Sequence, residues 1–325
     1  MKKKILITGG AGFIGSYLTE ALLKQGNSVT VADNFSTGSE KNLSAVRENP
    51  DLTVLKLDVT QDCEMLDALV KECDVLIHLA AAVGVEMVVN DPIHTLSTNV
   101  KGTENVLGPA ARYGKRTIVA STSEVYGKSD RETFSETDDL HLGSPYRSRW
   151  SYACSKLLDE FYVMAYCQNA GLPGTIVRFF NTVGPRQTGR YGMVVPRFAQ
   201  AAAENRNVQV YGDGEQSRCF CHVKDVVRAL LLLIDEPRAI GNIYNIGSQE
   251  LVSVRELAER VIARAGSSSQ IEYIPYEKAY AKGFEDMRRR RPNTDAISAL
   301  TGWKAEYSLD DILDDVLASI RNERN

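Results

Sequence analysis

Short runs rich in β-branched residues alternate with helical segments over the first 180 residues, and this alternation constrains the fold more than any other feature. Parallel strands need a crossover connection, which is usually a helix. The pattern therefore predicts an α/β fold with a doubly wound parallel sheet of the Rossmann type. The predicted strands are Ile5–Thr8, Val29–Asp33, Thr53–Leu57, Val75–Leu79, Thr117–Ala120 and Thr175–Phe179.

The pattern becomes irregular after Phe179, where glycine and proline interrupt it, and then helices return with readable ends. Ser253 and Glu256 form a capping box, Gly266 follows that helix, and Ser308 opens the last one. We expect a sheet domain at 1–178 with a returning segment at about 222–248. The segments 179–221 and 249–325 are expected to form a smaller α/β lobe.

Composition excludes several classes of protein. The chain has 325 residues, 43% of them hydrophobic, and a net charge of −4, so it has enough apolar material for a core and no overall attraction to nucleic acid or anionic membranes. No apolar run is long enough to span a membrane or to act as a signal peptide. The six cysteines form no C-x-x-C pair, and Cys219, Cys221 and His222 lie too close together to complete a metal site. We expect a cytoplasmic protein with reduced thiols and no metal.

A glycine-rich loop joins the first strand to the first helix. Gly10, Gly12 and Gly15 fit the fingerprint in which small residues let the backbone approach a pyrophosphate at a helix N-terminus, and the same loop also has the spacing Gly9-x-x-Gly12-x-x-Gly15. Asp33 ends the second strand, where a carboxylate accepts hydrogen bonds from a ribose and repels a 2′-phosphate. The sequence thus predicts NAD as cofactor, in preference to NADP.

Tyr152 and Lys156 are four residues apart in a helical segment that runs to about Gly171, so they share one face of the helix. An ammonium roughly 6 Å from a phenol, at an effective dielectric constant of about 20, lowers the phenol pKa by roughly two units. We therefore expect Lys156 to lower the pKa of Tyr152 and make it a base near neutrality.

Hydroxyl and carboxyl groups follow the fifth predicted strand. Thr122, Ser123 and Glu124 come directly after Thr117–Ala120 and Ser121. In open α/β sheets, ligands bind beyond the carboxyl ends of the strands. These residues are therefore candidate catalytic groups.

The chain resembles the extended short-chain dehydrogenases/reductases, in particular the NAD-dependent nucleotide-sugar epimerases and dehydratases. The resemblance rests on Thr8–Ser16, Asp33-Asn34, Leu57–Val59, His78–Ala81, Asn99–Thr103 and the Tyr-x-x-x-Lys motif at Tyr152 and Lys156. It implies a homodimer and a first reaction step that oxidises the sugar at C4, with Thr122 and Tyr152 at the sugar O4. It also implies cofactor contacts from Gly9, Gly12, Phe13, Ile14, Gly15, Asp33, Asn34, Asp58, Val59, Leu79, Ala80, Ala81, Asn99, Tyr152 and Lys156. His78 is interpreted as a core residue.

The second half of the chain resembles the lobe with which these enzymes bind a nucleoside diphosphate sugar, most commonly a UDP-sugar. Arginine suits this task because its planar fork matches phosphate oxygens. By this resemblance the substrate-binding residues are Asn181, Arg186, Val195, Tyr211, Arg218 and Arg290.

Members of this family differ in the reaction that the 4-keto sugar undergoes. A hexuronate can lose its C6 carboxylate as CO2, a hexose can lose water across C5 and C6, and a 4-epimerase returns the hydride to the other face of C4. Glu124 argues against a simple 4-epimerase, in which small residues are usual at this position. The segments Thr122–Gly127, Arg149–Lys156, Arg218–Phe220 and Arg290–Pro292 resemble UDP-glucuronate decarboxylases.

We therefore predict a UDP-glucuronate decarboxylase in which Ser123, Glu124 and Arg290 surround C5 and C6. The alternatives are a UDP-sugar 4-epimerase acting on UDP-glucose or UDP-glucuronate, an NDP-hexose 4,6-dehydratase, and a regulatory protein that binds NAD and nucleotide without catalysis. Ser123 stands where dTDP-glucose dehydratases usually carry an acid, which weakens the dehydratase alternative.

Overall fold

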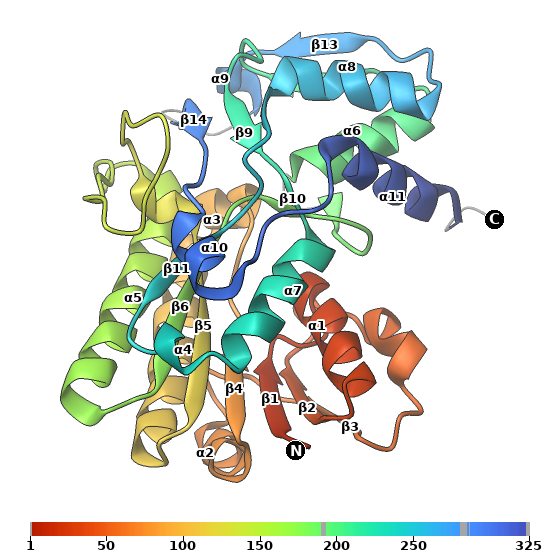
Figure 1. Ribbon diagram of the computed structural model, residues 1–325. Coiled ribbons are helices and arrows are strands. Elements are labelled where there is room, and N and C mark those ends of the chain that lie inside the picture. Colours follow the sequence, from red (N-terminus) through yellow and green to blue (C-terminus); the bar gives the residue numbers. More distant parts are fainter. Residues whose placement is uncertain (1, 190–192, 280–284, 286, 323–325) are drawn as a thin grey trace.

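A seven-stranded parallel sheet organises the larger part of the molecule in the computed structural model, which describes residues 2–189, 193–279, 285 and 287–322 (Figure 1). The strand order is β11-β6-β5-β4-β1-β2-β3, and all neighbours run parallel. The strands are β1 (Lys4–Thr8), β2 (Ser28–Asp33), β3 (Leu52–Lys56), β4 (Val75–His78), β5 (Arg116–Thr122), β6 (Gly174–Phe179) and β11 (Ile243–Ile246). The predicted doubly wound sheet is confirmed.

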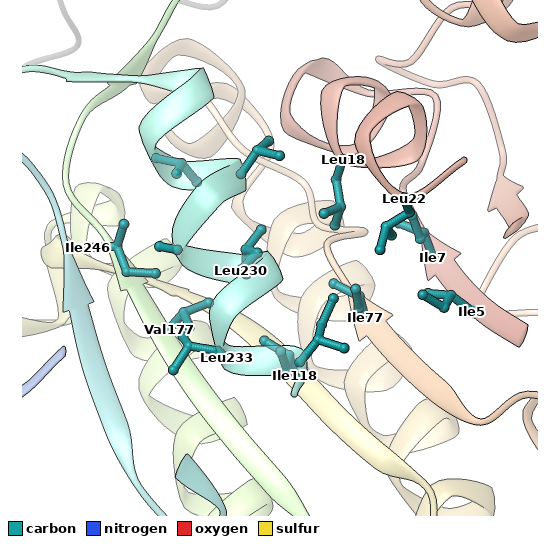
Figure 2. Close-up of a cluster of buried hydrophobic side chains, with 14 of the residues drawn as sticks. Ile5, Ile7, Leu18, Leu22, Ile77, Ile118, Val177, Leu230, Leu233 and Ile246 are labelled. Atoms are coloured by element: carbon teal, nitrogen blue, oxygen red, sulfur yellow. The ribbon is translucent and has the colours of Figure 1, made fainter. Parts of the chain in front are cut away.

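Helices cover both faces of this sheet. The helices of this part of the chain are α1 (Phe13–Lys24), α2 (Cys63–Glu72), α3 (Val85–Asn90), α4 (Pro92–Arg112), α5 (Ser151–Ala170) and α7 (Val223–Ile234). Leu18 and Leu22 of α1 and Leu230 of α7 lie over Ile7 and Ile77 of the sheet (Figure 2). Burial of such side chains supplies the main stabilisation of the sheet.

The smaller part of the molecule has its own apolar core. It contains α6 (Val194–Ala203), α8 (Val254–Ala265) and α11 (Leu309–Asn322), which pack on one another and bury Phe198, Leu257 and Leu313 (Figure 1). Its other elements are β7 (Thr182–Val183), β8 (Val208–Tyr211), β9 (Ser217–Cys219), β10 (Cys221–His222), β12 (Leu251–Ser253), β13 (Ile271–Ile274), α9 (Tyr276–Ala279) and β14 (Arg289–Arg290). It is an α/β lobe with short two- and three-stranded sheets. Helix α10 (Asp295–Thr301) instead packs on β11 of the larger sheet and buries Ile297 in its core.

The local signals in the sequence have the predicted structural outcome. Ser253 Oγ accepts a hydrogen bond from Glu256 N, and Gly266 ends α8 in the left-handed conformation. Ser308 Oγ accepts from Asp311 N at 3.2 Å. None of the helices in the described part of the chain is long and apolar enough to cross a membrane.

Candidate active site

A cleft of about 610 Å³ runs from the glycine-rich loop, past the carboxyl ends of β4 and β5, to the smaller lobe. Its size lies in the range of ligand pockets. Every predicted site residue except Asn99 lines it: Gly9, Gly12, Phe13, Ile14, Gly15, Asp33, Asn34, Asp58, Val59, Leu79, Ala80, Ala81, Thr122, Ser123, Glu124, Tyr152, Lys156, Asn181, Arg186, Val195, Tyr211, Arg218 and Arg290. Residues far apart in the sequence thus share one cavity.

The glycine-rich loop needs glycine because of its own close packing. Gly9 has φ +73°, and a Cβ there would lie 2.7 Å from Ala80 N. A Cβ on Gly15 would overlap the carbonyl oxygen of Gly9. Helix α1 begins at Phe13, so its N-terminus opens directly on the cleft. This geometry fits a pyrophosphate.

The Asp33 carboxylate stands at the end of β2 and is held by the loop. Its oxygens accept hydrogen bonds from Ala11 N at 2.9 Å and Phe35 N at 2.8 Å. Burial raises the pKa of Asp33, and these backbone donors oppose that rise. A fixed carboxylate at this place fits the unmodified ribose of NAD.

Thr122 and Tyr152 meet at the centre of the cleft. Tyr152 is hydrogen bonded to the side chain of Thr122, which also accepts from Glu124 N at 3.2 Å. Burial raises the pKa of Tyr152, and the negative charges of Glu124 and Asp159 raise it further. Two hydroxyl groups therefore converge where a sugar hydroxyl can be held.

The structure corrects the expected effect of Lys156 on Tyr152. Lys156 Nζ donates to Asp159 Oδ2 at 2.7 Å, and both side chains are almost fully buried. Burial, together with the negative charges of Glu124 and Asp159, holds the pKa of Tyr152 above its ordinary value rather than below it. The sequence reasoning considered the spacing of Tyr152 and Lys156 but overlooked the acid one turn further along the same face.

Glu124 lies between two arginines. Its carboxylate forms ion pairs with Arg149 and with Arg290, the latter at 3.4 Å. Burial would raise the pKa of Glu124, but Arg149 and Arg290 outweigh this effect and hold the pKa below its ordinary value. Glu124 is therefore a carboxylate at neutral pH. Arg218, further away, also favours this charge.

Asn99 lies outside the cleft and supports its wall. The Asn99 side chain accepts from Ala82 N at 2.7 Å and donates to Ser155 Oγ at 3.0 Å. It thereby ties the loop after β4 to helix α5. Its placement favours a structural contribution to the cleft over direct contact with a ligand.

The predicted substrate residues border the cleft from the smaller lobe. Asn181 and Arg186 have positive φ, 34° and 71°, which is uncommon for residues with a Cβ and frequent at ligand sites. Asn181 Nδ2 donates to Cys219 O at 2.9 Å, while the Arg186 guanidinium pairs with Glu20 at 2.7 Å. Tyr211 packs its ring against Arg197.

Sequence reasoning missed Arg149 as a site residue. Arg149 begins a segment that resembles decarboxylases, but the sequence does not single it out; in the structure it is 3% exposed, lines the cleft and pairs with Glu124. The available signal was an arginine three residues before Tyr152. That spacing places Arg149 just before α5, the helix that carries Tyr152.

These features define the class of protein. A Rossmann sheet whose cleft is lined by a glycine-rich loop and a Tyr-Lys pair is typical of enzymes that use a nicotinamide dinucleotide as cofactor. The chain belongs to the NAD dependent epimerase/dehydratase family, whose model matches residues 5–247. It is an NAD-dependent enzyme of the extended short-chain dehydrogenase/reductase type that modifies nucleotide sugars.

Two relatives are decarboxylases of UDP-linked sugar acids. The chain is 41% identical to the UDP-N-acetyl-alpha-D-glucosaminuronate decarboxylase of Bacillus cytotoxicus, with 100% of both chains covered. It is 34% identical to UDP-glucuronic acid decarboxylase 1 of Xenopus tropicalis, covering 99% of this chain and 73% of the relative.

Solved structures show the same fold with several activities. Pal from Bacillus thuringiensis superposes with a TM-score of 0.90 at 27% identity, covering 98% of this chain and 99% of that one. The UDP-glucuronic acid 4-epimerase of Bacillus cereus, solved with UDP-glucuronic acid and NAD, gives a TM-score of 0.88 at 26% identity over 98% and 99% of the two chains. Fold alone therefore does not select the reaction.

Proposed function

We propose that this enzyme is a UDP-hexuronate decarboxylase, with UDP-glucuronate as the predicted substrate. The observation that carries the proposal is the Arg149–Glu124–Arg290 cluster, which lines the cleft with Tyr152 and whose side chains are at most 12% exposed. A neutral hexose needs no pair of arginines at this place, whereas a sugar that carries a C6 carboxylate does.

The first half of the reaction uses the residues at the sugar C4. Tyr152 takes the proton of the C4 hydroxyl while Thr122 holds that oxygen, and Lys156 supplies positive charge to the developing phenolate. When bound, NAD supplies the hydride acceptor at C4 and the donor that returns the hydride. The Gly9–Gly15 loop and Asp33 are suited to hold it.

The second half of the reaction depends on the charges of the Arg149–Glu124–Arg290 cluster. In the 4-keto sugar acid the ketone is β to the carboxylate, so breakage of the C5–C6 bond releases neutral CO2 and leaves an enolate whose charge is at the C4 oxygen. Arg149 and Arg290 attract the substrate carboxylate, while the Glu124 carboxylate repels it. The repulsion is relieved as the negative charge moves from C6 toward the oxygen held by Tyr152 and Thr122.

Protonation of C5 completes the second half. Glu124 is ionised, since its arginine partners lower its pKa, and so it is poorly suited to donate a proton. Arg290 is held by Glu124 and is our candidate for the C5 proton donor, and Ser123 lines the same cleft.

The two candidate substrates differ in the substituent at C2 of the sugar. The Bacillus cytotoxicus relative is named for a 2-acetamido sugar acid, and the Xenopus tropicalis relative for glucuronic acid. Both sugar acids carry a C6 carboxylate that Arg149 and Arg290 could bind. The assay should therefore include both.

The decisive experiment is to incubate the full-length protein with NAD⁺ and either UDP-glucuronate, UDP-N-acetylglucosaminuronate or UDP-glucose, and to analyse products by mass spectrometry and proton NMR. Loss of CO₂ from a UDP-hexuronate supports the proposal. An unchanged mass with a new configuration at C4 would instead identify a 4-epimerase. Loss of water from UDP-glucose would identify a dehydratase, and binding without turnover a regulatory protein.

We infer that the enzyme is a homodimer that joins through α4 and α5. These helices pack on each other and expose apolar side chains: Ile93 is 77% exposed, Phe161 65% and Leu158 42%. Exposed apolar side chains of this size are typical of an interface. Light scattering of the double variant Leu158→Glu, Phe161→Glu should show a monomer, and an unchanged mass would contradict this interface.

We further propose that residues 179–221 and 249–325 bind the nucleotide sugar while 1–178 and about 222–248 bind NAD. The separate apolar core around Phe198 and Leu257 supports this division. A cytoplasmic location is supported by the cysteines, all six of which are free.

A further inference from the structure

A line of buried polar side chains connects β1 with the lysine of the active site. Thr8 Oγ1 and His78 Nδ1 are 2.7 Å apart, and His78 Nε2 lies 3.1 Å from Thr103 Oγ1. Thr103 hydrogen bonds to the Asp159 carboxylate, which binds Lys156 Nζ at 2.7 Å. All five side chains belong to residues that are at most 3% exposed.

The hydrogen bonds in this line have only one consistent direction. Burial lowers the pKa of His78 to about 3, so its ring is neutral and one nitrogen must accept. Because Thr103 donates to Asp159, it accepts from His78 Nε2–H, and Nδ1 accepts from the Thr8 hydroxyl. Thr8 Oγ1 in turn accepts from Ala80 N at 3.5 Å, in the cleft wall.

The buried carboxylate of Asp159 lowers the stability of the fold. Burial raises its pKa, and its Oδ1 atom is buried with no hydrogen-bond partner in the described part of the chain. A buried acid with an unmatched oxygen destabilises a fold. Its position against the active-site lysine points to a role in the reaction.

Several charged groups act on Tyr152 and Asp159. From helix α5 itself, Lys156 and Glu160 face Asp159, and Asp159 acts on Tyr152. Glu124 and Arg149, from the segments before α5, also act on Tyr152. Thr103 of α4 and His78 of β4 bring no charge, so Asp159 and Glu124 are the negative charges that act on the tyrosine.

We propose that Asp159 is a positioning residue which, held by His78 and Thr103, fixes Lys156 and sets the pH range in which Tyr152 removes the C4 hydroxyl proton. The inference rests on the proposed roles of Tyr152 and Lys156. It does not depend on whether the 4-keto sugar is decarboxylated, epimerised or dehydrated.

The expected size of the effect follows from helix geometry. Residues 152 and 159 are about two turns apart, roughly 11 Å along the axis. A unit charge at that distance, with an effective dielectric constant of about 20, shifts a pKa by about one unit. Loss of the Asp159 charge should therefore lower the pKa of Tyr152 by about one unit.

The test is the isosteric variant Asp159→Asn, whose amide keeps the side-chain shape. The pKa of Tyr152 is read in the NAD complex from the ¹³Cζ resonance that disappears in Tyr152→Phe. In parallel, the pH profile of kcat/KM is measured for the first oxidation step. We expect the tyrosine titration and the acid limb of the profile to move together to lower pH by about one unit.

Glu160→Gln is the matched control because it removes the neighbouring buried carboxylate of the same helix. Two nitrogens of Arg178 bind both oxygens of Glu160, and the negative charges that act on Tyr152 are those of Glu124 and Asp159. The control variant should lower stability without moving the tyrosine titration. An Asp159→Asn enzyme whose titration stays in place, or moves to higher pH because Lys156 gives up its proton, would overturn the proposal.

Asp159→Ser is the second variant, for the case that Asp159→Asn does not fold. It also removes the negative charge beside Lys156, so the tyrosine titration and the acid limb should move to lower pH as in Asp159→Asn. No movement would again overturn the proposal. The NMR titration needs no turnover, so absence of decarboxylation on every sugar acid would refute the proposed function without affecting this test.

Discussion

Replacing Glu124 by Gln tests the charge argument for decarboxylation most directly. The variant keeps the shape of the side chain and its ability to hydrogen bond to Arg149 and Arg290. It removes only the negative charge. If that charge repels the C6 carboxylate in the ground state, its loss should strengthen substrate binding and slow the release of CO2.

The magnitude follows from the Glu124–Arg290 contact. Arg290 Nη1 lies 3.4 Å from Glu124 Oε1. A substrate carboxylate on the far side of the same guanidinium would lie about twice as far, roughly 7 Å, where two charges repel by about 2.4 kcal/mol at an effective dielectric constant of about 20. Complete relief of this repulsion in the transition state corresponds to roughly 50-fold in rate. We expect kcat to fall by about 10- to 50-fold and KM to fall with it, the pattern of lost ground-state repulsion.

The assay is single-turnover release of CO2 from the UDP-hexuronate that the wild-type enzyme accepts, together with the steady-state KM. Glu160→Gln is the control for the loss of a buried, arginine-paired carboxylate outside the cleft. Decarboxylation by Glu124→Gln within a few-fold of the wild-type rate would refute the reasoning. A lower kcat with a higher KM would show instead that Glu124 acts by positioning the arginines.

Three further predictions concern other parts of the molecule. Tyr152→Phe should lower kcat by roughly 10²- to 10⁴-fold, which is the usual contribution of a general base. Calorimetry should find NAD binding nearly unchanged. A loss of NAD binding as large as the loss of kcat would contradict the role of Tyr152 as the base. Asp33→Asn should weaken NAD binding by about 10-fold, since it turns charge-assisted hydrogen bonds into neutral ones, and it should improve NADP binding. Fluorescence titration with both cofactors measures the two affinities. An unaltered preference for NAD over NADP would contradict the assignment of Asp33 to the ribose. The buried, neutral His78 should make the fold sensitive to acid. Its folded pKa of about 3 lies below its ordinary value of 6.5, so the unfolded chain takes up a proton that the native protein excludes. Urea unfolding should show stability falling as the pH drops from about 6.5 toward 3, and His78→Asn should fall less steeply.

Much of the fold was predictable because its signals are local. Each of the six strands predicted in the first 180 residues appears in the sheet, within a few residues of the expected ends. The fingerprint at Gly9–Gly15 sits between a strand and a helix, and its glycines are required by contacts within the loop itself. Ser253, Glu256 and Gly266 specify their helix ends through hydrogen bonds over three or four residues.

The charges of the site were less predictable because they depend on contacts between distant residues. Arg290 is 166 positions from Glu124 and 138 from Tyr152, and its contact with Glu124 exists only after the smaller lobe folds back over the sheet. Arg149 was within sight of Tyr152 in the sequence, but nothing in the sequence showed that it pairs with Glu124.

The sequence by itself determined the sheet, the cofactor loop and most of the residues that line the cleft, because hydrophobic period, turn residues and helix caps act over short distances along the chain. Only the tertiary structure decided the protonation states. The pKa of Tyr152 depends on its burial and on the charges of Glu124 and Asp159, and the charge of Glu124 depends on arginines from two other segments. Electrostatic energies depend on distance in space and on burial, and both are properties of the folded chain.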